Sequence, residues 1–118
     1  MANPNIVNVA TINGKTDVFA LTTTETNLVT ATANTVFKIN SIMVSNIDGS
    51  NPADVTIKYN DGSDDRAIAS TISVPADATL AVIDKNTSFY LEENEIIKGT
   101  ASANSDLECL ISYEIISD

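Results

Sequence analysis

The sequence predicts an all-β fold, a single β-sandwich of about eight to ten short antiparallel strands with jelly-roll or immunoglobulin-like topology. Two observations support it. Ile, Val and Thr alternate with polar residues in many short runs, and Asn, Asp, Gly and Pro interrupt these runs at short intervals. Apolar residues do not recur at helical spacing, so no helix is expected. With 118 residues, the chain is expected to form one domain over residues 1–118.

The first third of the chain contains three weaker strand candidates. Ile6–Ile12 and Asp17–Leu21 are separated by Asn13-Gly14, a pair typical of tight hairpin turns. Asn27–Ala31 follows a threonine-rich run, which we interpret as sheet and connector because β-branched residues suit a pleated surface. Residues 1–10 could instead form an N-terminal arm.

The middle third contains two of the clearest strand patterns. In Val36–Ile47 the apolar side changes near Asn40, which predicts either a bulge or a strand covered on both faces. Ala53–Asn60 alternates regularly and predicts one buried and one wet face. Arg66–Val74 is a weaker candidate that follows a turn at Asn60–Ser63.

The last third is predicted to end in a strong strand. Thr79–Ile83, Ser88–Leu91 and Glu95–Ser102 are short candidates, and Leu107–Ile115 alternates regularly almost to the C-terminus. Leu107–Ile115 places Cys109 among apolar residues, so we expect a buried, unreactive thiol.

The charge balance excludes two classes of partner. Sixteen acidic and six basic side chains give a net charge of −10, which repels phosphate backbones and anionic lipid surfaces. We therefore expect no nucleic acid and no membrane partner. No apolar run is long enough to span a membrane, and the N-terminus lacks a signal-peptide pattern, so a soluble protein made in the cytoplasm is expected.

The sequence does not indicate an enzyme. It has no histidine, which removes the commonest general base and metal ligand together, and no phosphate-binding glycine motif, so no cofactor is expected. Glu92, Glu93 and Glu95 could supply paired carboxylates, but without tryptophan a sugar-binding cleft is not indicated. We interpret these three residues as a solvated turn.

One loop gathers oxygen ligands of the kind that calcium prefers. Asp61, Asp64 and Asp65 are weak candidate metal ligands, but the loop lacks the spacing and closing glutamate of an EF-hand. A hairpin turn is the favoured interpretation. The loop around Asp48 could add ligands if it lay beside the first.

Four segments resemble a family of small β-sandwich virion proteins of marine tailed phages, including those of cyanobacteria. They cover nearly the whole chain: Asn3–Thr16, Val36–Ile42, Val44–Thr56, and Ile72–Leu80 leading to Tyr90–Glu95. At Glu93-Asn94-Glu95 similar sequences often carry Gly-Asp in the turn, and because Asn also tolerates positive φ the turn is expected to persist. The resemblance implies a virion structural protein without catalytic residues.

These observations lead to three functional hypotheses. The first is a capsid decoration or cement protein, a homo-oligomer and most favourably a trimer, that binds the major capsid protein. The second is a tail, neck or fibre adaptor or tip protein that binds tail or neck proteins. The third is a calcium-dependent carbohydrate-binding module using the Asp48 and Asp61 loops.

The N-terminal segment is the expected assembly element. An arm at Ala2–Asn8, with Asn5, Ile6 and Val7 at its centre, could pair with the sheet edge of a neighbouring subunit by strand addition.

Overall fold

The computed structural model describes residues 3–118, which form nine β-strands. Within this range there is no helix that could cross a membrane. The strands are β1 Thr11–Ala20, β2 Thr26–Thr30, β3 Thr35–Asn46, β4 Ala53–Asn60, β5 Asp65–Val74, β6 Thr79–Ile83, β7 Phe89–Leu91, β8 Ile96–Ala101 and β9 Leu107–Ser117.

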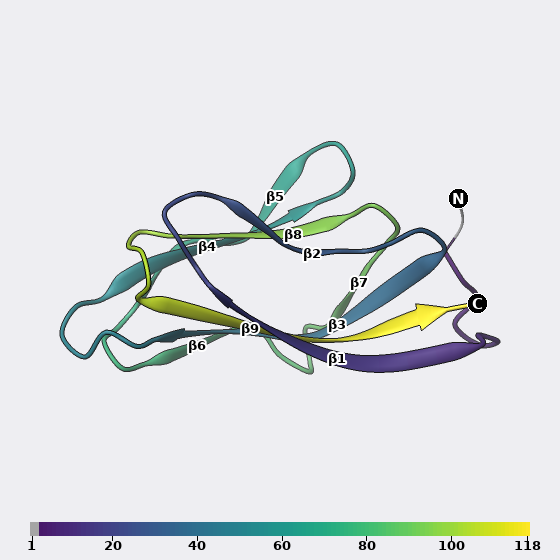
Figure 1. The fold of residues 1–118 in the computed structure, drawn as a ribbon, viewed down its shortest axis with the longest axis horizontal. Coiled ribbons are helices and arrows are strands. Elements are labelled where there is room, and N and C mark those ends of the chain that lie inside the picture. The colour runs from purple at the N-terminus through teal and green to yellow at the C-terminus, as the bar shows by residue number, and fades with distance from the viewer. Residues whose placement is uncertain (1–2) are drawn as a thin grey trace.

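The strands form two antiparallel sheets that pack face to face (Figure 1). One sheet has the order β1-β9-β3-β6, with β7 also pairing β3, and the other has the order β2-β8-β4-β5. When β7 is set aside, the first strand pairs with the last, the second with the second to last, and so on inward to β4 and β5. This is a jelly roll, so the predicted β-sandwich is confirmed with the first of its two expected topologies.

The core lies between the sheets and is built from the inward side chains of the central strands. Ile39, Ile42 and Val44 of β3 are fully buried, as are Ile57 of β4 and Ile111 of β9. Because each deletion of such a side chain removes apolar burial and leaves a cavity, these contacts dominate the stability of the fold.

Cys109 belongs to this core, as predicted. It is completely buried, and burial raises the pKa of its thiol to about 12, so the thiol stays protonated.

The change of buried side in β3 is produced by a bulge. The register against β9 shifts between Ile39 and Ser41, and the extra residue is Asn40, whose Nδ2 donates to Glu114 Oε2 at 3.0 Å. The bulge lets Ile39 and Ile42 both point into the core although their numbers differ in parity.

The N-terminal strands were predicted wrongly. Ile6–Ile12 and Asp17–Leu21 are not two strands around a turn, because the single strand β1 runs straight through Asn13-Gly14. Ten consecutive residues of β1 pair with β9 without a register shift. The long-range ladder with β9 therefore outweighs the local turn preference of Asn13-Gly14.

Candidate assembly surface

The outward face of the β1-β9-β3-β6 sheet carries two apolar rows that run across the strands. Cross-strand partners point to the same face, so the register defines each row. The first, which we call the covered row, consists of Ile12, Ile116 and Val36. The second, which we call the open row, consists of Val18, Leu110, Met43 and Ala81.

The two rows differ in solvent exposure. Ile116 and Val36 of the covered row are each only 4% exposed, although they lie outside the core between the sheets, whereas Ile12 at the β1 end of this row is 55% exposed. Val18 and Met43 of the open row are 61% and 36% exposed. An apolar row across a sheet that nothing covers is the kind of surface that binds another protein.

The chain's own N-terminal segment lies against the covered row. Asn3, Pro4 and Ile6 line a shallow hollow together with Val36 and Tyr90. Pro4 is buried, and Asn3 Nδ2 donates to Glu92 Oε1 at 2.7 Å, which ties the segment to the turn after β7. The segment therefore packs on its own sheet.

The three residues expected to mediate assembly form a turn and not an extended strand. The Asn8 N–H donates to the Asn5 carbonyl at 3.1 Å, and the Val7 N–H donates to Asn5 Oδ1 at 3.0 Å. Ile6 is 48% exposed and Val7 is 91% exposed. Ala2, the start of the expected arm, lies outside the described residues.

The candidate metal ligands hold a hairpin turn between β4 and β5. Asp61 Oδ1 accepts the N–H groups of Asp64 at 2.8 Å and Ser63 at 3.0 Å, which lowers the pKa of the Asp61 carboxyl. Asp65 Oδ1 accepts Asn60 Nδ2 at 2.8 Å and lies 3.1 Å from Lys98 Nζ, and both contacts lower its pKa.

The aspartates do not converge on a common point. The Asp64 carboxylate forms an ion pair with Arg66, with 4.0 Å between Asp64 Oδ2 and Arg66 Nη2, and does not join Asp61 and Asp65 in a common site. Over residues 3–118, no three acidic, cysteine or histidine side chains are placed to hold one metal ion. The loop is the favoured hairpin turn.

The loop around Asp48 cannot complete a site with the Asp61 loop. Asp48 lies before β4 and Asp61 follows it, so the eight residues of β4 separate the two loops, a distance of roughly 25 Å. Asp48 Oδ1 accepts the N–H groups of Ser50 at 2.8 Å and Asn51 at 3.2 Å, which lowers its pKa. Each loop closes on itself.

The outward face of the β2-β8-β4-β5 sheet is polar. Lys58 and Lys98 are cross-strand neighbours, and Glu25 bridges them with distances of 2.9 Å and 4.0 Å. Glu25 raises the pKa of Lys58, so this lysine stays charged. The two sheets thus present opposite kinds of surface, one with an apolar row and one with an ion-pair network.

The glutamate turn between β7 and β8 is less solvated than predicted. Asn94 adopts φ 67° there, as expected for this position. Glu95, however, is buried, and its Oε1 accepts the Glu92 N–H at 2.7 Å. It also accepts the hydroxyl of Tyr59, so the pKa of Tyr59 is raised by burial and by this contact. Glu95 is a structural acceptor, and its predicted exposure was wrong.

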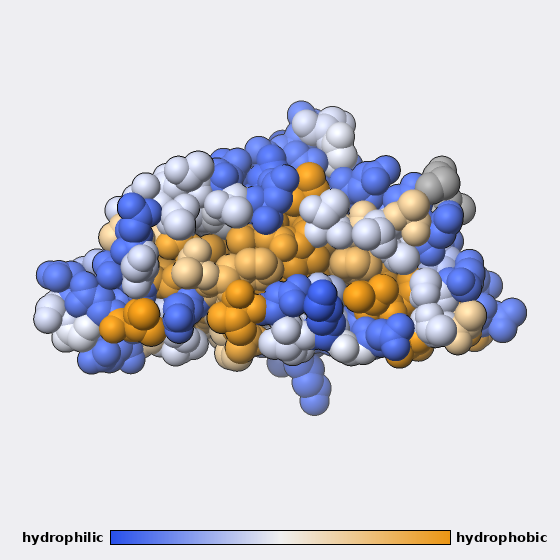
Figure 2. All heavy atoms as spheres, in the orientation of Figure 1, coloured by the Kyte–Doolittle hydropathy of each residue, from blue (hydrophilic) through white to orange (hydrophobic). Residues whose placement is uncertain are grey.

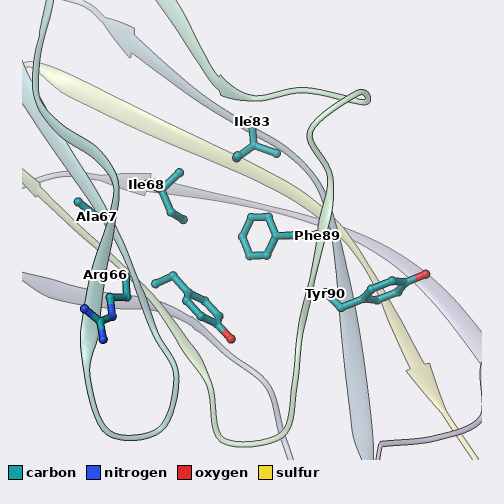
Figure 3. Close-up of a pocket in the computed structure, with 7 residues that line it drawn as sticks. Arg66, Ala67, Ile68, Ile83, Phe89 and Tyr90 are labelled. Carbon is teal, nitrogen blue, oxygen red and sulfur yellow. The ribbon is translucent and has the colours of Figure 1, made fainter.

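A shallow apolar hollow lies between β5 and β7. Figure 3 shows Ile68, Ile83 and Phe89 grouped around it, with Arg66 at its rim. Tyr59 and Phe89 pack edge to face with ring centroids 6.0 Å apart. Arg66 is the charged residue of the lining, which includes no carboxylate, so the hollow offers no acid-base pair.

Seen from the side in Figure 2, apolar atoms form a band between the two layers, with polar atoms above and below. Phe19 of β1 and Leu28 of β2 are only partly buried against the core. The sandwich is therefore not fully closed along its β1 and β2 side.

No protein-family model and no curated protein matches this sequence. Two solved structures share its fold. One comes from Bacillus endospore appendages, described as disulfide-linked pili, with 13% identity and a TM-score of 0.54 over 92% of this chain and 88% of that chain. The other comes from the acid-stable capsid of Helicobacter pylori bacteriophage KHP30, with 8% identity and a TM-score of 0.53 over 92% and 89%.

The likeness establishes the fold. At these identities side-chain chemistry is not shared, so what this chain binds must be argued from its own surface. Both similar chains are parts of large protein assemblies, a pilus and a capsid.

Proposed function

We propose that this protein is a non-enzymatic structural component of a phage virion, and specifically a capsid decoration or cement protein of the head shell. The open row carries the proposal, because Val18, Leu110 and Met43 present apolar surface on one face of a compact jelly roll. The shared fold with a phage capsid chain and the resemblance to tailed-phage virion proteins support this placement.

The chemistry of the surface supports a binding role over a catalytic one. The acidic side chains considered as catalysts or metal ligands accept hydrogen bonds from backbone or side-chain amide groups or pair with cations. Cys109 is the only cysteine and is completely buried, so association through disulfides, as in the pili, is not supported in this chain.

The proposed mechanism is mass action. A protein that binds the assembled shell, and not its free subunits, stabilises the shell by the free energy of that binding. The partner is then the major capsid protein, the location is the virion after synthesis in the host cytoplasm, and the protein acts as a small symmetric homo-oligomer.

Binding to capsids of the parent phage tests the proposal. Purified protein is mixed with decorated and undecorated capsids, and saturable co-sedimentation with the undecorated shell is expected. Met43→Glu places a charge in the open row and is expected to weaken binding by at least tenfold, about 1.4 kcal/mol or more. Ile47→Glu is the matched control, since Ile47 is exposed in the loop after β3 and outside the row.

Two results would contradict the cement hypothesis. If Met43→Glu and Ile47→Glu reduce binding equally, the open row is not the surface that contacts the capsid. Binding confined to the tail or its vertex would instead support the second hypothesis, a tail, neck or fibre adaptor.

A further inference from the structure

The two sheets end in strands that differ in how well their outer edge is protected. β2 has five residues and a register shift, and β6 and β7 have five and three. β5 has two shifts against β4 and a residue with positive φ, Thr71. Short strands and bulges are the usual protection against pairing with another chain. β1 has neither, because its ten residues pair with β9 in one unbroken register.

The outward hydrogen-bonding groups of β1 follow from one bond at its end. The Leu21 N–H donates to the Leu107 carbonyl at 2.9 Å, and these two residues are opposite each other in the register. In an antiparallel ladder the groups of alternate residues point to opposite sides. The even-numbered residues of β1 therefore have their N–H and C=O groups pointing away from β9. These residues are Ile12, Gly14, Thr16, Val18 and Ala20.

We propose that β1 pairs antiparallel with β1 of a second copy of this chain, about a two-fold axis at Thr16. Thr16 is then opposite the partner's Thr16, and both have their backbone groups turned towards the shared edge. Such an interface is isologous, because the same strand supplies both sides. The β1-β9-β3-β6 sheet continues from one molecule into the other, which is the geometry of strand addition.

The charges of β1 select this register. With the axis at Thr16, Lys15 is opposite the partner's Asp17, and the same pair occurs twice by symmetry. Moving the axis by one residue places Lys15 opposite the partner's Lys15, or Asp17 opposite the partner's Asp17. Directly opposed like charges destabilise a strand pair, whereas opposite charges stabilise it. Lys15 Nζ and Asp17 Oδ1 already lie 3.7 Å apart on one face of β1. In the dimer, these two side chains and the same two of the partner would form one cluster of four charges.

The apolar residues of β1 also fit this register. Ile12 is opposite the partner's Ala20, and Val18 is opposite the partner's Gly14, where the space that a Cβ would occupy is open. Ile12 and Val18 are among the most exposed large apolar side chains of the strands, and pairing covers part of both. Because opposed residues point to the same face, the open rows of both molecules end up on the same side.

The pairing is independent of the proposed virion function, since it can be measured on the protein alone. It also specifies the symmetry of the homo-oligomer. Two-fold pairing yields a dimer, so the mass in solution decides between this interface and the trimer expected from the sequence.

A charge-exchange experiment tests the register. The wild type is expected to have twice the monomer mass in sedimentation equilibrium. In a dimer of the Lys15→Glu variant, acidic side chains at positions 15 and 17 are opposite each other twice. In a dimer of the Asp17→Lys variant, basic side chains are opposite each other twice at the same positions. Each variant alone is therefore expected to associate about tenfold more weakly. In an equimolar mixture of the two variants, every acidic side chain at these positions is opposite a basic one. The mixture is therefore expected to recover wild-type association as a heterodimer.

Two further variants control for folding and for net charge. Thr16→Pro removes an outward N–H, which an edge strand tolerates, and the exposed hydrogen bond from Thr16 Oγ1 to Ser112 Oγ at 3.3 Å. The variant is expected to be folded by circular dichroism and monomeric by sedimentation equilibrium. Lys85→Glu makes the same charge change as Lys15→Glu in the loop between β6 and β7, and is expected to leave the dimer unchanged.

Three results would overturn the proposal: a wild-type monomer at about 1 mM, a trimer, or a dimer that Thr16→Pro leaves intact. A mixture of Lys15→Glu and Asp17→Lys that stays as weak as its components would overturn the register. Should Asp17→Lys fail to fold because Asp17 accepts the Tyr113 hydroxyl at 2.7 Å, Thr16→Pro still decides.

Discussion

The two apolar rows lie on the same face of the same sheet, yet Val36 and Ile116 of the covered row are buried, whereas Val18 and Met43 of the open row are exposed. The buried Pro4 and the side chain of Ile6 lie beside Val36 of the covered row, and Val36 and Ile116 are as buried as core residues although they lie outside the core. Within residues 3–118 the open row has no such cover, and Val18 is 61% exposed. The difference shows that apolar residues on an outward sheet face become part of the fold where another segment covers them, and stay accessible to a partner where none does.

Truncating one residue of each row gives the largest expected contrast. Ile116→Ala removes a buried side chain and leaves a cavity, so it is expected to lower the free energy of unfolding by about 2–5 kcal/mol. Val18→Ala is expected to change it by less than about 0.5 kcal/mol. Urea unfolding monitored by circular dichroism measures both, and equal losses would show that the rows do not differ.

The covering segment itself offers a smaller contrast between neighbouring residues. Ile6 lines the hollow beside Val36, whereas Val7 is 91% exposed. Ile6→Asp places a charge against the covered row and is expected to cost about 1 kcal/mol, while Val7→Asp is expected to stay within about 0.5 kcal/mol. If both substitutions cost the same in thermal unfolding, the segment does not cover the row through Ile6.

A fall in pH protonates carboxylates in the polar turns and leaves the apolar rows unchanged. Its effect on the free energy of unfolding is expected to be the smallest of the three. The pKa of Asp61 is lowered in the folded state by the N–H groups of Asp64 and Ser63. A lowered pKa contributes stability that is present above the unfolded value of about 3.9 and is lost as the pH falls through the folded-state pKa. Asp61→Asn is expected to flatten the fall in unfolding free energy below about pH 4. Identical pH dependence of variant and wild type would contradict this role.

Much of the fold could be predicted because its strands alternate over their whole length. Ala53–Asn60 was predicted with its observed bounds. The change of side near Asn40 predicted either a bulge or a strand covered on both faces, and the structure has the bulge. The N-terminal part could not be predicted, since Asn13-Gly14 favours a turn locally and only pairing with β9 shows otherwise. Local patterns do not carry such long-range information.

The surface was harder to predict than the fold for the same reason. Met43 and Leu110 interrupt the expected alternation with apolar residues on the outward side, which is a visible signal in the sequence. That they adjoin Val18 depends on the order β1-β9-β3, which the sequence does not show. The buried state of Glu95 likewise depends on Tyr59 from another strand.

Cryo-electron microscopy of undecorated capsids of the parent phage, incubated with this protein, tests the cement hypothesis most directly. Density is expected at regular lattice positions, with the β1-β9-β3-β6 sheet facing the shell and the open row in contact with it. Density at the lattice positions in which the Lys58 and Lys98 face touches the shell, or no density on the head at all, would contradict it.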